Sequence, residues 1–204
     1  MGVRFDSEKN CFVFDFEHDG QNDIIQLTGC GYEVTAFSHC FYYGYEFSEE
    51  IDGSVRSAFI KYIKFTENLK GNPEITHFIQ KAIDDLSKKI DLYDYDLVVM
   101  PESSSKVNQY MIRYIYRFAQ PMLREMELVK ALPDKLSSQN TLSEKDQLLR
   151  DAIRQRNVLV IDDIATSGST LNEVLRSLRL LNEDNKITIF SLIGRKDLTI
   201  ESME

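Results

Sequence analysis

The 204-residue sequence is poor in the features that mark secreted, membrane and zinc-binding proteins. Its three cysteines, Cys11, Cys30 and Cys40, are odd in number and lack disulfide or zinc-ligand spacing, so we expect reduced thiols. No apolar run approaches the roughly 18 to 20 residues that cross a bilayer. The first ten residues contain no apolar stretch typical of a signal peptide. We therefore expect a cytoplasmic protein without membrane association.

Positive charge is scarce in the first half of the chain. Residues 1–100 carry 9 Lys and Arg against 18 Asp and Glu, whereas residues 101–204 carry 15 of each kind. An acidic surface repels phosphate backbones, and a nucleic-acid binder ordinarily shows a basic excess. We therefore expect no extended nucleic-acid partner. A small anionic ligand is still compatible with the neutral second half.

The first part of the chain is patterned mainly as strands. Three runs are rich in β-branched and aromatic residues, at 11–16, 24–29 and 34–43. Such runs predict strands. A helical period follows over 55–63, with Arg56, Lys61 and Lys64 on the polar face. The pattern predicts a β-rich N-terminal hood with one helix over residues 1–72.

From residue 73 onward, strands alternate with helices. Short apolar runs predict strands at 96–100, 157–162 and 186–194, and residues 126–130 are compatible with a further strand. Asn72 before Pro73 predicts the start of a helix. Further helices are predicted at 107–118, 143–153 and 171–181. The alternation predicts an α/β core over 73–204, with a parallel sheet and helices on both faces.

The segment VLVIDDIATSGSTLNEV, residues 158–174, carries the clearest chemical pattern. An apolar strand ends in Asp162 and Asp163, and a turn around Gly168 leads directly into a helix. Backbone amides of such a turn, with the positive helix N-terminus, form a site for a phosphate dianion. The carboxylates would repel that phosphate and suit ribose hydroxyls or a water on a divalent metal. Because burying unpaired carboxylates is costly, we expect them to face solvent, a metal-bound water or the ribose diol.

This segment resembles the signature of the type I phosphoribosyltransferases, in which two acidic residues follow a hydrophobic strand and precede a T-S/T-G-x-T-like loop. A Walker-type phosphate loop and a dinucleotide fingerprint are absent. The resemblance implies a transferase that uses phosphoribosyl pyrophosphate and Mg²⁺, ribosylates a nitrogen of a base or amine, and releases pyrophosphate. The run 39–65 faintly resembles the competence-type (ComF-like) members of the family.

The resemblance also implies roles for individual residues. Asp162 and Asp163 would bind the ribose hydroxyls and act in catalysis. Mg²⁺ would be held through the substrate, and the resemblance leaves open whether these two carboxylates also bind it. The 5-phosphate would be held by Ala165, Thr166, Ser167, Gly168, Ser169 and Thr170. Pyrophosphate would be held by Ser103, Ser104, Ser105 and Lys106. In a polar segment where the family has a flexible loop, Lys130 and Lys135 would assist the leaving group.

The acceptor and the class of activity stay open at this point. Purine-salvage members often carry an aspartate at the position of Thr166, which disfavours hypoxanthine or guanine as the acceptor. A non-catalytic regulator or adaptor that senses phosphoribosyl pyrophosphate is one alternative function. A hydrolase or phosphorylase of a ribosyl phosphate is another. The sequence also leaves the oligomeric state open, a homodimer included.

Overall fold

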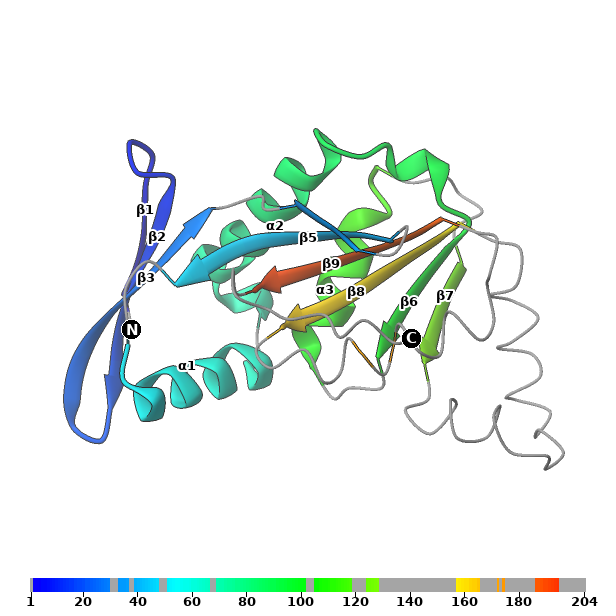
Figure 1. Ribbon diagram of the computed structural model, residues 1–204. Helices are drawn as coiled ribbons and strands as arrows, with labels where there is room; N and C mark the ends of the chain where they lie inside the picture. The colour runs from blue at the N-terminus through cyan, green and yellow to red at the C-terminus, as the bar shows by residue number, and fades with distance from the viewer. Residues whose placement is uncertain are drawn as a thin grey trace, which may run out of the picture.

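A computed structural model gives the architecture of the N-terminal lobe and of the core strands (Figure 1). The described residues are 2–29, 33–36, 39–47, 51–66, 69–101, 105–118, 124–128, 157–165, 172, 174 and 186–194. Within them, one sheet extends from the N-terminal strands into the core, and three α-helices pack against it.

Five strands of this sheet run parallel to one another. Their order is β5 (His39–Phe47), β9 (Ile187–Ile193), β8 (Val158–Ile164), β6 (Leu97–Pro101) and β7 (Arg124–Leu128). Every residue of β8 and β9 is buried, as continuous apolar strands require when both faces of a sheet are covered. The predicted parallel arrangement is confirmed, and the strand bounds differ from the predicted ones by one or two residues.

Antiparallel strands extend the sheet on one side. They are β1 (Gly2–Asp6), β2 (Cys11–His18) and β3 (Gln21–Gly29), with β4 (Glu33–Ala36) paired to β5. Asp19 and Gly20 join β2 to β3 with positive φ angles of 50° and 75°, as a tight hairpin turn requires. The run 34–43, predicted as one strand, divides between β4 and β5. The predicted domain division at residue 72 stays a prediction.

The helices begin where the sequence provides caps. They are α1 (Gly53–Phe65), α2 (Pro73–Ser87) and α3 (Lys106–Ile115), with short 3₁₀ turns η1 (Leu69–Gly71) and η2 (Leu92–Asp94). The Asp52 side chain accepts a hydrogen bond from the Ser54 backbone N–H at 2.8 Å and starts α1. Asn72 precedes Pro73 at the start of α2, as predicted, and the apolar stripe of this helix is buried.

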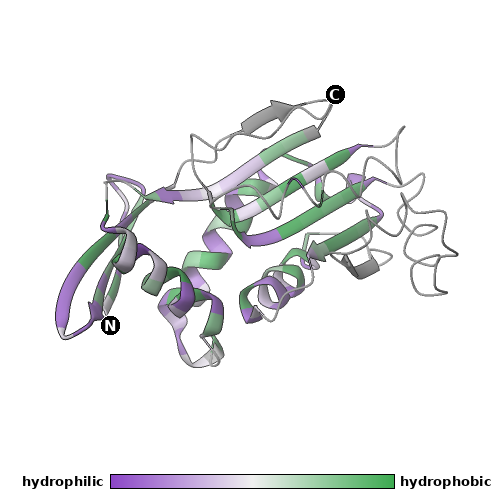
Figure 2. Ribbon diagram, turned by 60° about the horizontal axis from the view of Figure 1, so that its bottom comes forward, coloured by the Kyte–Doolittle hydropathy of each residue, from purple (hydrophilic) through white to green (hydrophobic). Residues whose placement is uncertain are grey.

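All three described helices pack on one face of the sheet, in a single core cluster with residues of β2, β5, β8 and β9. Gly44 of β5 allows a close approach, because a Cβ there would lie 2.9 Å from the Ala82 Cβ of α2. Figure 2 shows the central strands coloured mostly as hydrophobic. The helices predicted at 143–153 and 171–181 lie outside the described residues, except for Asn172 and Val174, which are helical. In the described part of the chain, no helix is long and apolar enough to cross a membrane.

Candidate functional site

Asp162 and Asp163 lie near the carboxyl end of β8, the middle strand of the parallel sheet. Their relative exposures are 5% and 1%. The expectation that they face solvent is therefore not met, because the structure buries both carboxylates. Burying two adjacent carboxylates costs several kcal/mol unless the protein supplies a compensating charge. The surroundings of this pair thus decide what the site can do.

Lys64, in the last turn of α1, supplies the compensating charge. Its Nζ lies 3.1 Å from Oδ1 of Asp163, and the Lys64 side chain is 33% exposed. Figure 1 shows the C-terminal end of α1 beneath the tip of the β8 arrow. The helical period predicts Lys64 on the polar face of its helix, and the structure adds Asp163 as its partner. A periodicity within one helix carries no signal of a partner that follows much later in the chain.

The two carboxylates differ in their electrostatic setting. Burial raises the pKa of Asp162 from 3.8 to about 7, and the neighbouring Asp163 charge adds to the rise. Three groups act against this rise: Lys64, the backbone N–H of Asp163 and the side chain of Asn108. The Asp163 N–H donates to Oδ1 of Asp162 at 2.9 Å. Near neutral pH, Asp162 can therefore either accept or donate a hydrogen bond.

Two more buried polar side chains surround the pair. Asn108, in the first turn of α3, is 1% exposed, and Ser191 of β9 is fully buried directly opposite Asp162 in the sheet. Within the described part of the chain, neither the Asn108 carboxamide nor the Ser191 hydroxyl has a hydrogen-bond partner of good geometry. A buried polar group without a partner costs about 1–3 kcal/mol. The sequence analysis missed both residues, since neither belongs to a recognisable motif.

The wall of the site next to β9 depends on a glycine. Gly194 follows β9 directly, and its backbone N–H donates to the Tyr45 carbonyl oxygen at 2.9 Å. A Cβ at Gly194 would overlap the ring of Tyr43, which stands opposite Ser191 on β5. The glycine therefore lets the Tyr43 ring pack against the backbone at the carboxyl end of the sheet.

The structure brings part of the predicted site to one edge of the sheet. Ala165 continues β8, is buried, and its N–H donates to the Ile193 carbonyl oxygen at 2.9 Å. Ser105 caps α3 and Lys106 begins it, just beyond the end of the neighbouring strand β6. The other predicted positions lie outside the described residues: Ser103, Ser104, Lys130, Lys135, Thr166, Ser167, Gly168, Ser169 and Thr170.

A cavity of about 340 Å³ lies elsewhere, where α2 meets β5, and includes none of these residues. Its wall contains Lys81 and Lys88, which pair with Asp85 at 2.9 and 2.7 Å. Lys89 also lines the wall, so three lysines there stand against one carboxylate. The carboxylates at the end of β8, whose polar neighbours have no hydrogen-bond partner of good geometry among the described residues, are the stronger candidate for a ligand site.

The side chains at this site suit a metal ion that arrives bound to the substrate better than a metal ion that the protein holds permanently. In the described ranges, no group of three or more His, Cys, Asp or Glu side chains could hold a metal. Mg²⁺ ordinarily keeps several waters and takes one or two carboxylates together with substrate phosphates. Asp162 and Asp163 fit that limited role, and Lys64 already occupies one oxygen of Asp163.

Comparisons with known proteins give one family match. Residues 112–202 match the family described as "Phosphoribosyl transferase domain". One similar solved structure is the crystal structure of a purine phosphoribosyltransferase from Pyrococcus horikoshii. It is 12% identical, the alignment covers 63% of this chain and 94% of that chain, and the TM-score is 0.35. No curated protein matches the sequence.

Proposed function

The chain carries a phosphoribosyl transferase domain, that of a glycosyltransferase-type enzyme, and from this premise we propose a specific reaction. The protein transfers the phosphoribosyl group of phosphoribosyl pyrophosphate to a nitrogen of a base or amine, with Mg²⁺, and releases pyrophosphate. The observation that carries the proposal is the buried pair Asp162–Asp163 with its single ammonium from Lys64. The pair lies at the carboxyl end of parallel strands, the edge where open α/β sheets bind ligands.

In this reaction, Asp162 and Asp163 accept hydrogen bonds from the ribose 2- and 3-hydroxyls. A hydroxyl would satisfy Oδ2 of Asp163, which has no hydrogen-bond donor among the described residues. As pyrophosphate departs, positive charge develops on the ribosyl ring. A fixed negative charge beside the ring stabilises that charge without any reorganisation of solvent. The carboxylates thus both orient the sugar and favour the transition state.

The phosphate groups of the substrate are assigned to the loops at the same edge. Residues 165–170 hold the 5-phosphate, and Ser103, Ser104, Ser105 and Lys106 hold pyrophosphate. Lys130 and Lys135 neutralise the leaving group. Mg²⁺ would supply charge neutralisation on the pyrophosphate oxygens. The start of α3 at Lys106, close to the end of β6, supports this division of roles.

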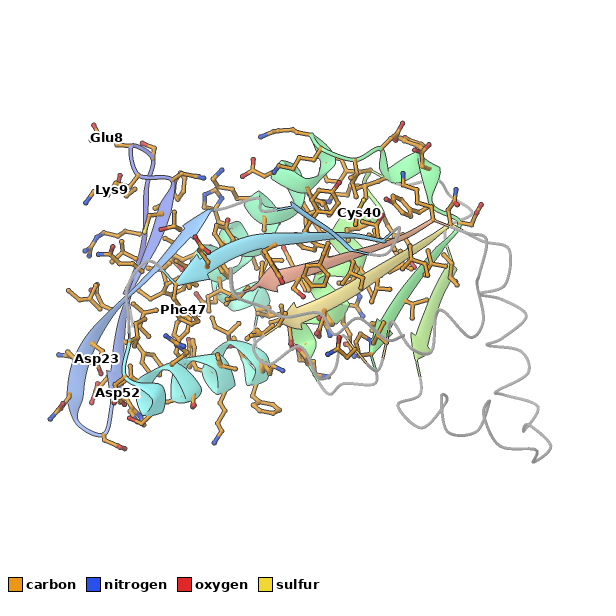
Figure 3. All side chains as sticks on the ribbon, in the orientation of Figure 1. Glu8, Lys9, Asp23, Cys40, Phe47 and Asp52 are labelled. Carbon is orange, nitrogen blue, oxygen red and sulfur yellow. The ribbon has the colours of Figure 1, made fainter. Side chains whose placement is uncertain are left out.

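Calorimetry with phosphoribosyl pyrophosphate and MgCl₂ tests binding, and a screen of purine, pyrimidine and amine acceptors for pyrophosphate release tests transfer. Asp162→Asn with Asp163→Asn should weaken binding of phosphoribosyl pyrophosphate by about 1–3 kcal/mol for each charged hydrogen bond lost. Inorganic phosphate should bind as before, because it needs only the backbone amides. Asp23→Asn is the matched control, since Asp23 lies on the hairpin strand β3 (Figure 3).

Each negative result points to a different conclusion. Binding without pyrophosphate release for any acceptor would contradict the transferase and support a regulator that senses the ligand. Release of ribose 5-phosphate with no acceptor present would support a hydrolase. Failure of the wild-type protein to bind phosphoribosyl pyrophosphate at all would contradict the proposed site itself.

A further inference from the structure

A cation from outside the matched segment contacts one of the two carboxylates. Lys64 belongs to α1, whereas the family match begins at residue 112. We propose that Lys64 is a positioning residue, which holds the Asp163 carboxylate in the orientation that receives a ribose hydroxyl. The inference rests on the proposed function and adds that the N-terminal lobe completes the ribose site.

The backbone that carries Lys64 is fixed by aromatic packing within that lobe. The Phe59 ring centroid lies 5.0 Å from that of Phe14 and 5.5 Å from that of Phe16, both on β2. Ile63, beside Lys64, is fully buried. Figure 3 shows Phe47, a further ring neighbour of Phe59, between the hairpin and α1. Lys64 therefore enters the site from a rigid helix end rather than from a loop.

The contact uses one side of the carboxylate only. Among the described residues, neither oxygen of Asp163 has a hydrogen-bond partner of good geometry, but the ammonium of Lys64 lies 3.1 Å from Oδ1. The charge contact therefore orients the carboxylate from its Oδ1 side, and Oδ2 is left for a hydroxyl donor. The ammonium also halves the negative charge of the pair, which reduces its repulsion of a ligand that carries phosphates. Without Lys64, the carboxylate would lose both its orientation and its counter-charge.

A purely structural ion pair would behave differently from a positioning residue. Loss of a structural pair lowers stability and affects every ligand of the site alike. Loss of a positioning residue weakens ligands that contain ribose and leaves bare phosphate unaffected, since the proposed function assigns phosphate to backbone amides of residues 165–170. The comparison between these two ligands separates the two roles.

The experiment measures Kd by calorimetry on the full chain for inorganic phosphate, for ribose 5-phosphate, and for phosphoribosyl pyrophosphate with MgCl₂. Lys64→Met should weaken ribose 5-phosphate about 10-fold, a loss in the range for hydrogen bonds to charged groups, and change inorganic phosphate by less than about 2-fold. Lys64→Arg should bind within about 3-fold of wild type, because it keeps the charge. Lys61→Met, an exposed position on the same helix, should bind both ligands like wild type.

The outcomes separate this inference from the function on which it rests. If wild type binds ribose 5-phosphate and folded Lys64→Met binds it equally or more tightly, the inference is wrong and the proposed function stands. If wild type binds neither ribose ligand, the proposed function is wrong and the inference falls with it. Should Lys64→Met not fold, Asp163→Asn is compared with the Lys64→Met/Asp163→Asn double variant. Equal affinities support action through Asp163, and a further loss in the double variant overturns it.

Discussion

In each of two regions of this protein an aspartate contacts lysine at similar distances, but the two aspartates differ in burial. Lys64 and Asp163 are 3.1 Å apart, whereas Asp85 is 2.9 Å from Lys81 and 2.7 Å from Lys88. The Asp163 side chain is 1% exposed, but the Asp85 side chain is 34% exposed. The shorter contacts therefore lie where water screens them. Burial, and not distance, determines which of the two contacts matters energetically.

The carboxyl groups of the two regions also titrate in opposite directions. At the end of β8, burial and the Asp163 charge raise the pKa of Asp162 to about 7. On α2, burial acts to raise the pKa of Asp85, but hydrogen bonds and charges from Lys88 and Lys81 outweigh it and lower the pKa. Carboxyl groups with strongly raised pKa values are common at functional sites, whereas the Asp85 carboxylate is paired with two lysines as a structural group.

The largest expected effect is a pH dependence of stability caused by Asp162. Its folded-state pKa is raised, so its contribution is fully present below about pH 4 and is lost as the pH rises through about 7. A rise from 3.8 to about 7 corresponds to a loss on the order of 4 kcal/mol. Asp162→Asn should therefore stabilise the protein at pH 8 and remove most of this decline, as measured by urea unfolding between pH 4 and 8.

Asp85→Asn is the control for that prediction. The lowered pKa of Asp85 makes its contribution present above 3.8 and lost only as the pH falls below that value. Its substitution should leave the slope of stability between pH 5 and 8 unchanged. An equal decline in wild type and Asp162→Asn would show that the carboxyl at the end of β8 is not the group responsible.

A smaller effect is expected from removing the lysine of each contact. Lys64→Met leaves a buried carboxylate without its cation and should lower the free energy of unfolding by about 2–3 kcal/mol, less than for a fully buried pair because Lys64 is partly exposed. Lys81→Met should cost less than about 1 kcal/mol, since Asp85 keeps Lys88 and water. Urea unfolding at pH 7 measures both, and equal losses would remove the distinction between the regions.

The contrast between these regions also explains what the sequence could predict. Asp162 and Asp163 were predicted as site residues because they end a contiguous apolar strand. The strand itself is identified by its composition and is present as β8, whereas the role of the two carboxylates stays a prediction. The α2 helix was predicted with its start at Pro73 because the cap and the stripe are local features. Both kinds of signal lie within a short window of sequence.

The neighbours of the two carboxylates could not be predicted in the same way. Lys64, Asn108 and Ser191 come from three elements and lie near the carboxylates through the packing of α1 and α3 against the sheet and the pairing of β9 with β8. Each one, considered alone, is an ordinary lysine, asparagine or serine in an amphipathic helix or a buried strand. The strand β1 was missed for a related reason, because this short segment forms a strand through its pairing with β2.

The smallest expected effect concerns salt. Double-mutant cycles built from Lys81→Met and Asp85→Asn, and from Lys64→Met and Asp163→Asn, give a coupling energy for each contact by urea unfolding at pH 7. Raising NaCl from about 0.1 to about 1 M shortens the Debye length from about 10 to about 3 Å, which screens partly exposed charges. The Lys81–Asp85 coupling, expected at about 0.3–0.5 kcal/mol in a helix, should then fall toward zero. The Lys64–Asp163 coupling should persist, because the 1% exposed carboxylate keeps salt ions away. Loss of both couplings in salt would mean that the end of β8 is as open to solvent as the surface of α2, and the distinction drawn from burial would fail.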